Sequence, residues 1–134
     1  MGETSASGGL SREGPYDWYQ RGLELLKSRS PAAAEQLLAR AAAAEPGSRS
    51  ILEALGRAQF QAGRYGQAKD SFARIIESNP ADDYAQFALG LSAARTGDLQ
   101  TAVEHLALAN AMRPDVAHYG RELRMVRARL EGSS

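Results

Sequence analysis

The stretch of residues 51–80, ILEALGRAQFQAGRYGQAKDSFARIIESNP, shows how the whole 134-residue chain is organised. It holds two short helical patterns joined by a turn that contains glycine. Three of its residues recur 34 positions earlier and 34 positions later, and no insertion interrupts this register from Pro15 to Val116. A fixed period of this length is typical of stacked helical repeats. The nine recurring positions are Gly22, Gly56 and Gly90, Ala34, Ala68 and Ala102, and Pro46, Pro80 and Pro114.

Each unit resembles the tetratricopeptide repeat, whose pattern reads Trp-x2-Leu-Gly-x2-Tyr, then Ala-x3-Phe, then Pro. The matching residues are Trp18, Gly22, Ala34-x3-Leu38 and Pro46 in the first unit, Leu55-Gly56, Ala68-x3-Phe72 and Pro80 in the second, and Leu89-Gly90, Ala102-x3-Leu106 and Pro114 in the third. The departures are Arg21 at the Leu position, Gln59 at the Tyr position and Gln86 at the Trp position. They weaken individual core contacts but leave the triple match in register.

The resemblance implies an all-α fold, namely a right-handed superhelical array (α-solenoid) of three helix-turn-helix repeats and a capping helix. We expect a single domain at 15–131, made of repeats at 15–48, 49–82 and 83–116 and a capping helix at 115–131. Within the repeats we expect helices at 16–28, 31–44, 49–61, 65–78, 82–95 and 98–112. Residues 1–14 are rich in Gly and Ser and predict a disordered tail, and 132–134 form a second tail.

The repeated glycines predict how the two helices of each unit pack. Glycine inside a helix costs about 1 kcal/mol relative to alanine, so a close approach of the second helix should compensate. We expect the alanines of the second helices to make this approach, pairing Ala34 with Gly22, Ala68 with Gly56 and Ala102 with Gly90. Ser30 and Asp98 are expected at the N-caps of second helices.

The overall composition favours a neutral, cytoplasmic protein. Lys plus Arg equals Asp plus Glu at 16 each, so no net charge attracts nucleic acid or an anionic membrane. The absence of cysteine excludes disulfides and cysteine metal sites. The N-terminus lacks the features of a secretory signal, and Ala6 stands where a myristoylation motif needs Ser or Thr. No apolar run approaches the length of a membrane span.

No arrangement of residues in the sequence predicts catalysis. The two histidines, His105 and His118, lie in no HExxH motif and at no metal-ligand spacing. No glycine-rich phosphate loop follows a strand pattern. We therefore expect a non-enzymatic protein with no catalytic, metal or cofactor-binding residues. A regulatory subunit of an enzyme complex remains an alternative.

The candidate binding surface lies on the first helix of each unit. At about 100° per residue, each first helix has a face that contacts within its own unit do not use. In the family that the chain resembles, these positions line the concave groove that holds a partner peptide. The large apolar members predict an exposed patch, although some could instead pack between neighbouring units. The predicted groove residues are Tyr16, Tyr19, Leu23, Lys27, Glu53, Arg57, Tyr84, Phe87, Leu91, Arg95, Arg121 and Met125.

This groove predicts an adaptor or scaffold that binds a protein partner, with no nucleic acid and no membrane. The bound peptide or helix should be apolar or aromatic with acidic residues, because Lys27, Arg57, Arg95 and Arg121 surround the patch. Some members of the family hold the EEVD tails of heat-shock chaperones through Lys, Asn and Arg. The corresponding positions here are Tyr19, Leu23, Ala54, Tyr84 and Ala88. A chaperone-tail adaptor is therefore not expected.

Two further possibilities concern the ends of the array. A self-associating structural module, a homo-oligomer, would bury the groove or the Tyr16 and Tyr19 end against a second copy. The last helix has an apolar stripe at Tyr119, Leu123, Val126 and Leu130 and a charged face of Arg121, Glu122, Arg124, Arg127 and Arg129. That face predicts a solvating cap, or alternatively a basic surface for an acidic partner.

Overall fold

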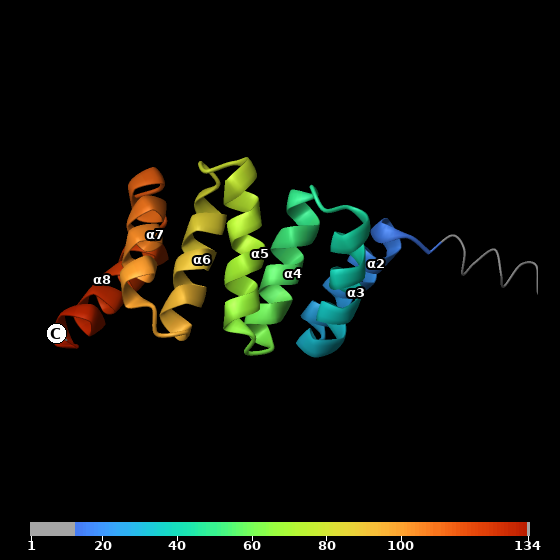
Figure 1. The fold of residues 1–134 in the computed structure, drawn as a ribbon, viewed down its shortest axis with the longest axis horizontal. Coiled ribbons are helices and arrows are strands. Elements are labelled where there is room, and N and C mark those ends of the chain that lie inside the picture. Colours follow the sequence, from blue (N-terminus) through green and yellow to red (C-terminus); the bar gives the residue numbers. More distant parts are fainter. Residues whose placement is uncertain (1–12, 134) are drawn as a thin grey trace, which may run out of the picture.

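The computed structural model describes residues 13–133, and these form seven helices and no strand. The helices are α2 (Pro15–Lys27), α3 (Pro31–Ala44), α4 (Arg49–Gln61), α5 (Tyr65–Ser78), α6 (Asp83–Arg95), α7 (Leu99–Met112) and α8 (Ala117–Gly132). They stand side by side in one row, with α2 at one end and α8 at the other (Figure 1). The all-α solenoid predicted from the 34-residue period is confirmed.

The helix bounds agree with the sequence predictions to within two residues. The last helix begins at Ala117 rather than 115, because residues 114–115 form a turn in which the Val116 N–H donates a hydrogen bond of 3.1 Å to the Arg113 carbonyl. It also extends to Gly132, into the segment expected to be a tail. Most of the other expected tail, residues 1–12, lies outside the described residues, as does Ser134.

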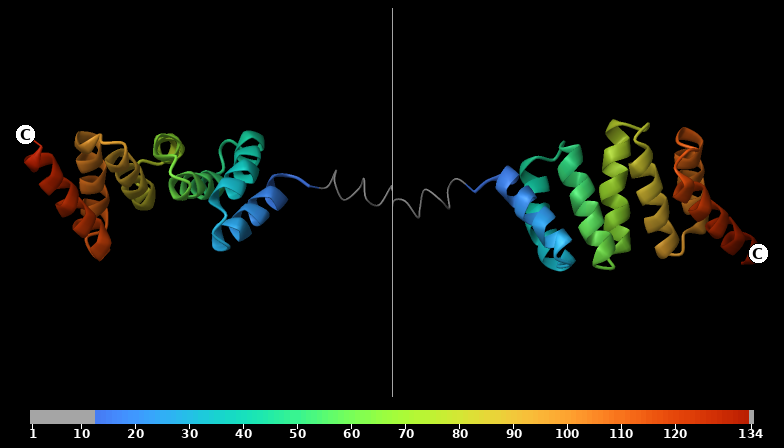
Figure 2. Two further views of the ribbon diagram at one scale, coloured as in Figure 1. Left: turned by 90° about the horizontal axis from the view of Figure 1, so that it is seen from below. Right: turned by 180° about the vertical axis from the view of Figure 1, so that it is seen from behind.

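The first and second helices of the repeats lie on different sides of the row. Each helix packs against the next one along the chain, and in addition α2 contacts α4 and α6 contacts α8. The view from below in Figure 2 shows α2 and α4 on one side and α3 and α5 on the other. The first helices therefore share a continuous surface that crosses the boundaries between repeats.

The repeated glycines make room for large side chains, which corrects our expectation that alanines approach them. A Cβ atom built on Gly56 would lie 2.7 Å from Cζ of Phe72, whose ring is fully buried. Side chains lean toward the N-terminus of their own helix, so a residue one turn after Ala68 reaches back over the crossing. The three close pairs are Gly22 with Leu38, Gly56 with Phe72, and Gly90 with Leu106.

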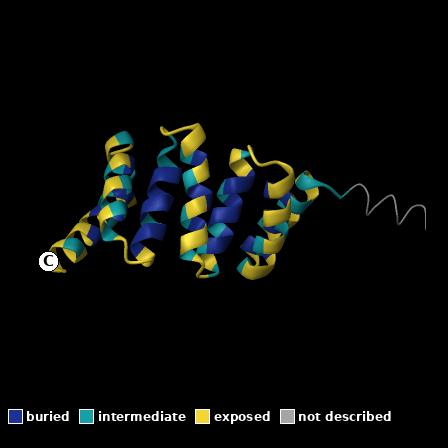
Figure 3. Ribbon diagram, viewed as in Figure 1, coloured by how far each residue is buried: buried dark blue, intermediate teal, exposed yellow. Residues whose placement is uncertain are grey.

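The core consists of two clusters that meet at α6. The first cluster contains buried residues of α2 to α6, among them Leu38, Leu55 and Phe72. The second contains buried residues of α6 to α8, among them Leu106 and Tyr119. Figure 3 shows that α4 and α6 are the most buried helices, since each of them contacts three other helices.

The turn inside each repeat contains one residue in the left-handed backbone region. Gly63 and Gly97 have φ values of 82° and 87°, and Arg29, at the equivalent position of the first repeat, has a φ of 63°. This conformation suits glycine, but it costs another residue about 1–2 kcal/mol. The caps that follow also differ, because the Asp98 side chain caps α7 as expected while the side chain of Ser30 accepts no hydrogen bond at the N-cap of α3.

Candidate functional site

A groove runs along the first helices, and it is formed by three hollows that share residues. Arg57 lines both the hollow beside α2 and the central one, while Phe60 and Leu91 line both the central hollow and the one beside α8. A fourth hollow lies at the start of α2, around Tyr16. These hollows include eleven of the twelve predicted residues, and Glu53 is the exception. We call this surface the first-helix groove.

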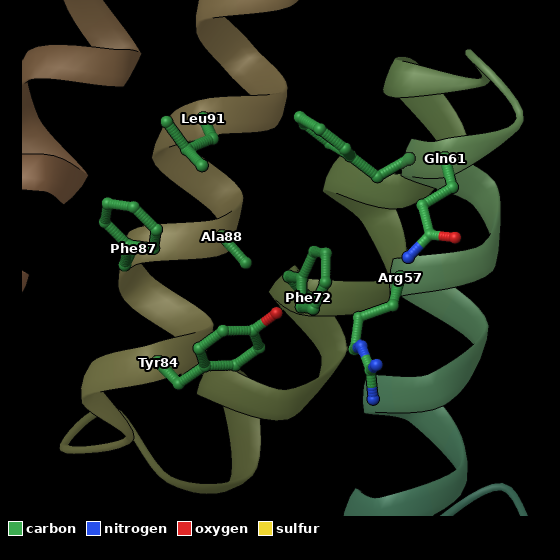
Figure 4. Close-up of a pocket in the computed structure, with 8 residues that line it drawn as sticks. Arg57, Gln61, Phe72, Tyr84, Phe87, Ala88 and Leu91 are labelled. Carbon is green, nitrogen blue, oxygen red and sulfur yellow. The ribbon is translucent and has the colours of Figure 1, made fainter. Parts of the chain in front are cut away.

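The central hollow lies between α4 and α6 and has a volume of about 160 Å³. In Figure 4, Arg57 and Gln61 extend from α4 on one side, and Phe87, Ala88 and Leu91 stand on α6 opposite them. An apolar cavity of about 150 Å³ accommodates a group of the size of benzene. The full lining is Arg57, Phe60, Gln61, Phe72, Tyr84, Phe87, Ala88 and Leu91.

The hollow beside α8 combines exposed apolar surface with arginines. Met125 is 56% exposed and stands in the same hollow as Phe60 and Leu91. The charged residues that line it are one glutamate, Glu122, and three arginines from two helices, namely Arg95, Arg121 and Arg129. This mixture suits a partner segment that is partly apolar and partly acidic.

The aromatic ring of Phe87 belongs mainly to the core, which is the alternative that the sequence left open for the large apolar groove residues. Phe87 is only 6% exposed, and its ring stacks on Tyr119 with a centroid distance of 4.5 Å. The hydroxyl of Tyr119 donates a hydrogen bond of 2.7 Å to Asp83. Burial, together with this bond, raises the pKa of Tyr119. The contacts of Phe87 and Tyr119 thus hold α8 against α6.

The other large apolar residues of the predicted groove differ in exposure. Tyr16 is 71% exposed, so it is available to a partner. Tyr19, Leu23 and Tyr84 are half-buried and pack against the first core cluster, and Leu91 packs against the second. The sequence predicted either an exposed patch or packing between units. Tyr16 fits the first interpretation, and the half-buried residues fit the second.

Glu53, the predicted residue that lies outside the hollows, belongs to an ion-pair network. The Arg49 guanidinium donates hydrogen bonds of 2.8 and 3.1 Å to the two carboxylate oxygens of Asp82, and it also pairs with Glu53. The hydrogen bond from Arg49 lowers the pKa of Asp82. Glu53 thus forms part of a link between α4 and the residue that caps the start of α6.

Arg95 is held in position by two aromatic rings. Its Nη1 atom donates a hydrogen bond of 2.9 Å to the hydroxyl of Tyr65. Its guanidinium carbon lies 5.0 Å from the centroid of Phe60 and 5.3 Å from that of Tyr65. Cation–π contacts of this kind restrict a long side chain that would otherwise sample many rotamers. Arg95 is therefore pre-positioned at the edge of the groove.

Three of the four cations in the predicted set remain available to a partner. Among residues 13–133, no ion pair or hydrogen bond engages Lys27, Arg57 or Arg121. Lys27 and Arg121 are exposed, whereas Arg57 is half-buried. The positive charge of the groove is thus only partly neutralised within the described part of the chain.

The predicted set omits several residues that line the groove or shape it, and three of them are informative. Phe60 lies on the predicted face of α4. The equivalent residue of α6 is the small Ala94, so the large side chain of Phe60 was the sequence signal that could have identified it as a groove residue. Arg129 lies on the last helix, three turns from its start. Tyr65 belongs to a second helix, so an analysis of first-helix faces cannot reach it, although it follows the turn directly.

Two other kinds of feature are absent from the described residues. Within residues 13–133, no group of three or more His, Cys, Asp or Glu side chains is arranged to hold a metal ion. In the same range, no helix combines the length and apolar character of a membrane span. His105 lies 2.6 Å from the side-chain oxygen of Gln86, and burial lowers its pKa. That histidine therefore packs between α6 and α7 as a structural residue.

The repeated helix pairs and the groove along their first helices define a helical-repeat module of the kind that binds other proteins. The sequence model described as tetratricopeptide repeat matches residues 19–68 and 53–117. The chain belongs to the tetratricopeptide repeat family. Proteins of this family are generally interaction modules. A comparison with curated protein sequences gives no match.

Solved structures of the same fold support this assignment. A crystal structure of YrrB, described as a TPR protein with an unusual peptide-binding site, has a TM-score of 0.79 and 23% identity over 84% of this chain. MamA (41-end) from Desulfovibrio magneticus RS-1 has a TM-score of 0.85 and 20% identity over 90% of this chain and 68% of its own. The first TPR of Spaghetti (RPAP3), bound to the HSP90 peptide SRMEEVD, has a TM-score of 0.82 and 15% identity, with coverages of 87% and 93%. This chain spans 58% of the length of YrrB.

Proposed function

We propose that the chain is a non-enzymatic adaptor or scaffold whose first-helix groove holds a short segment of a partner protein. The observation that carries this proposal is the continuity of the groove, since Arg57, Phe60 and Leu91 each line two adjoining hollows. A segment in this groove would contact several repeats at once. The descriptions of YrrB as peptide-binding and of RPAP3 as bound to a peptide support a role of this type.

The partner segment should differ from the chaperone tail that is bound to RPAP3. At the positions where a carboxylate clamp would place Lys, Asn or Arg, this chain has Tyr19, Leu23, Ala54, Tyr84 and Ala88. Ala54 and Ala88 are also buried, so they offer a ligand no polar group. We therefore propose that recognition rests on the apolar central hollow and on the arginines around it.

The test is a selection of random peptides of about twelve residues against the full chain, followed by binding measurements on two variants. Met125→Glu places a charge in the groove at an exposed residue, and Leu108→Glu places the same charge on α7, where the apolar side chain is 46% exposed and lines none of the hollows described. We expect Met125→Glu to weaken binding at least about tenfold and Leu108→Glu to leave it unchanged.

Two results would contradict the proposal. Equal binding by wild type and the Met125→Glu variant would place the peptides outside the groove. A concentration-dependent increase in mass by sedimentation, abolished by Met125→Glu, would instead show that the groove binds a second copy of the chain.

A further inference from the structure

We propose that the segment held in the groove is acidic and carries one large apolar side chain, which enters the central hollow while a neighbouring carboxylate binds Arg57. This inference rests on the proposed function, because it specifies the chemistry of the partner for the same groove. Three observations carry it: the size and lining of the hollow, the state of Arg57, and the charges along the groove.

The central hollow fits one side chain of the size of Phe or Leu. Its volume of about 160 Å³ is close to that of an apolar cavity that holds benzene. Phe72, which is only 1% exposed, helps to line it, and Ala88 leaves space where a longer side chain would fill the hollow. We therefore expect the partner to place one apolar side chain, the anchor, in this hollow and not a polar group.

Arg57 lines both this hollow and the one beside α2, and no residue in the range 13–133 pairs with it. Its side chain is half-buried, which strengthens an ion pair relative to one on the open surface. Among unmodified peptide side chains, a carboxylate is the group that can accept two parallel hydrogen bonds from a guanidinium. A carboxylate beside the anchor is thus the group that fits Arg57.

Tyr84 supplies a second polar group near the same place. Burial raises the pKa of its hydroxyl, although the positive charge of Arg57 opposes this shift. The hydroxyl therefore stays protonated and can donate a hydrogen bond. Among residues 13–133 no hydrogen bond engages this hydroxyl, so an incoming carboxylate could satisfy both Tyr84 and Arg57.

The charges along the groove favour acidic residues on both sides of the anchor. The chain as a whole is neutral, with 16 basic and 16 acidic residues. The three connected hollows are nevertheless lined by five cations and two carboxylates, namely Lys27, Arg57, Arg95, Arg121 and Arg129 against Glu24 and Glu122. A basic segment would meet repulsion along this whole path, whereas an acidic one is complementary to it.

The experiment uses fluorescent synthetic peptides of about twelve residues and the full chain. One peptide has a central Phe flanked by Asp and Glu, a second has the same Phe flanked by Lys, and a third has the acidic flanks around a central Ala. We expect the first peptide to bind at least about tenfold more tightly than either of the others, and its affinity to fall as salt is added.

Matched variants assign the effect to Arg57. Arg57→Gln should weaken binding of the acidic Phe peptide about tenfold, and Tyr84→Phe should weaken it less. Arg127→Gln removes an equal charge from an exposed position that lines none of the hollows described, and it should have no effect. Circular dichroism checks that each variant is folded, and Arg57→Lys, which keeps the charge, should retain part of the affinity.

Different results separate the failure of this inference from failure of the proposed function. Groove binding by Lys-flanked peptides, or full affinity in a folded Arg57→Gln variant, would overturn the inference and keep the proposed function. The same holds if peptides from the random selection bind the groove but lack acidic residues. Peptide binding that Met125→Glu does not disturb would overturn both.

Discussion

Helices α2 and α6 hold the same place in the first and third repeats, but they differ along the side that faces the preceding repeat. Three residues of α2 on this side are polar and exposed, and the residues 68 positions later in α6 are small and buried. The three pairs are Asp17 and Ala85, Gln20 and Ala88, and Glu24 and Ser92. The inner helix α6 has small residues on this side because α5 packs onto it. The terminal helix α2 has polar residues there because the outer face of an array contacts water.

The other end of the array shows the same difference. Arg124 and Arg127 of α8 stand 34 positions after Gly90 and Ala93, which are both buried in α6. Arginines at these positions occupy the space that the second helix of a repeat would need. Neither terminal helix therefore presents the surface that holds helices together inside the array. This supports the interpretation of the arginine face of α8 as a solvating cap.

The largest expected effect comes from moving a residue of the terminal helix into the inner one. Ser92→Glu places an unpaired carboxylate at a fully buried position, so we expect the free energy of unfolding to fall by roughly 3–5 kcal/mol in urea titrations. The reverse change at the equivalent exposed position, Glu24→Ser, should stay within about 0.5 kcal/mol of wild type. Similar losses in both variants would show that α2 is also covered.

A second expected effect concerns the aromatic contact between α6 and α8. Phe87→Ala removes the ring that stacks on Tyr119, and truncation of a buried Phe usually costs about 3–5 kcal/mol. Tyr16→Ala, at an exposed ring on the terminal helix, should change stability by less than about 0.5 kcal/mol. Thermal unfolding followed by circular dichroism gives both values. A stable Phe87→Ala variant would mean that α8 does not depend on this contact.

A third, smaller effect tests the glycine crossings. Gly56→Leu forces a side chain against Phe72, since even a Cβ atom would lie 2.7 Å from its ring. Overpacking of this kind costs about 1–3 kcal/mol, and it should outweigh the gain in helix propensity. The matched change at the terminal helix is Arg124→Leu, which meets no second helix and should cost little. Unfolding in urea measures both, and an unchanged Gly56→Leu midpoint would contradict the packing at this crossing.

The sequence predicted the fold well because a 34-residue period constrains every repeat in the same way. It could not predict which groove aromatics are exposed. Tyr19 and Phe87 are equivalent in the period, yet Tyr19 is half-buried and Phe87 is buried. Tyr119 stacks on Phe87, whereas the residue 32 positions after Tyr19 is the smaller Ile51, which lines a hollow together with Tyr19. A large residue on the next first helix covers the ring, and a pattern within one helix does not contain that information.

The partner of Gly56 could not be predicted for a similar reason. The spacing of the sequence places both Ala68 and Phe72 on the side of the second helix that meets the first. Only the lean of the side chains decides that Phe72, and not Ala68, fills the space at the glycine. Likewise, Arg95 is restrained by Tyr65, a residue of the neighbouring second helix.

The smallest expected effect lies in the turn of the first repeat, which differs from the other two turns. Arg29 adopts a φ of 63°, where Gly63 and Gly97 occupy the equivalent positions. Replacing it by glycine removes a conformational cost of about 1–2 kcal/mol, but the unfolded chain gains entropy worth about 0.4–1 kcal/mol. Arg29→Gly should therefore stabilise the protein by roughly 0.5–1 kcal/mol, measured as an increased midpoint in urea. The reverse change, Gly63→Arg, should destabilise it by a similar amount. A loss of stability in Arg29→Gly would show that the arginine side chain makes a favourable contact that outweighs its backbone strain.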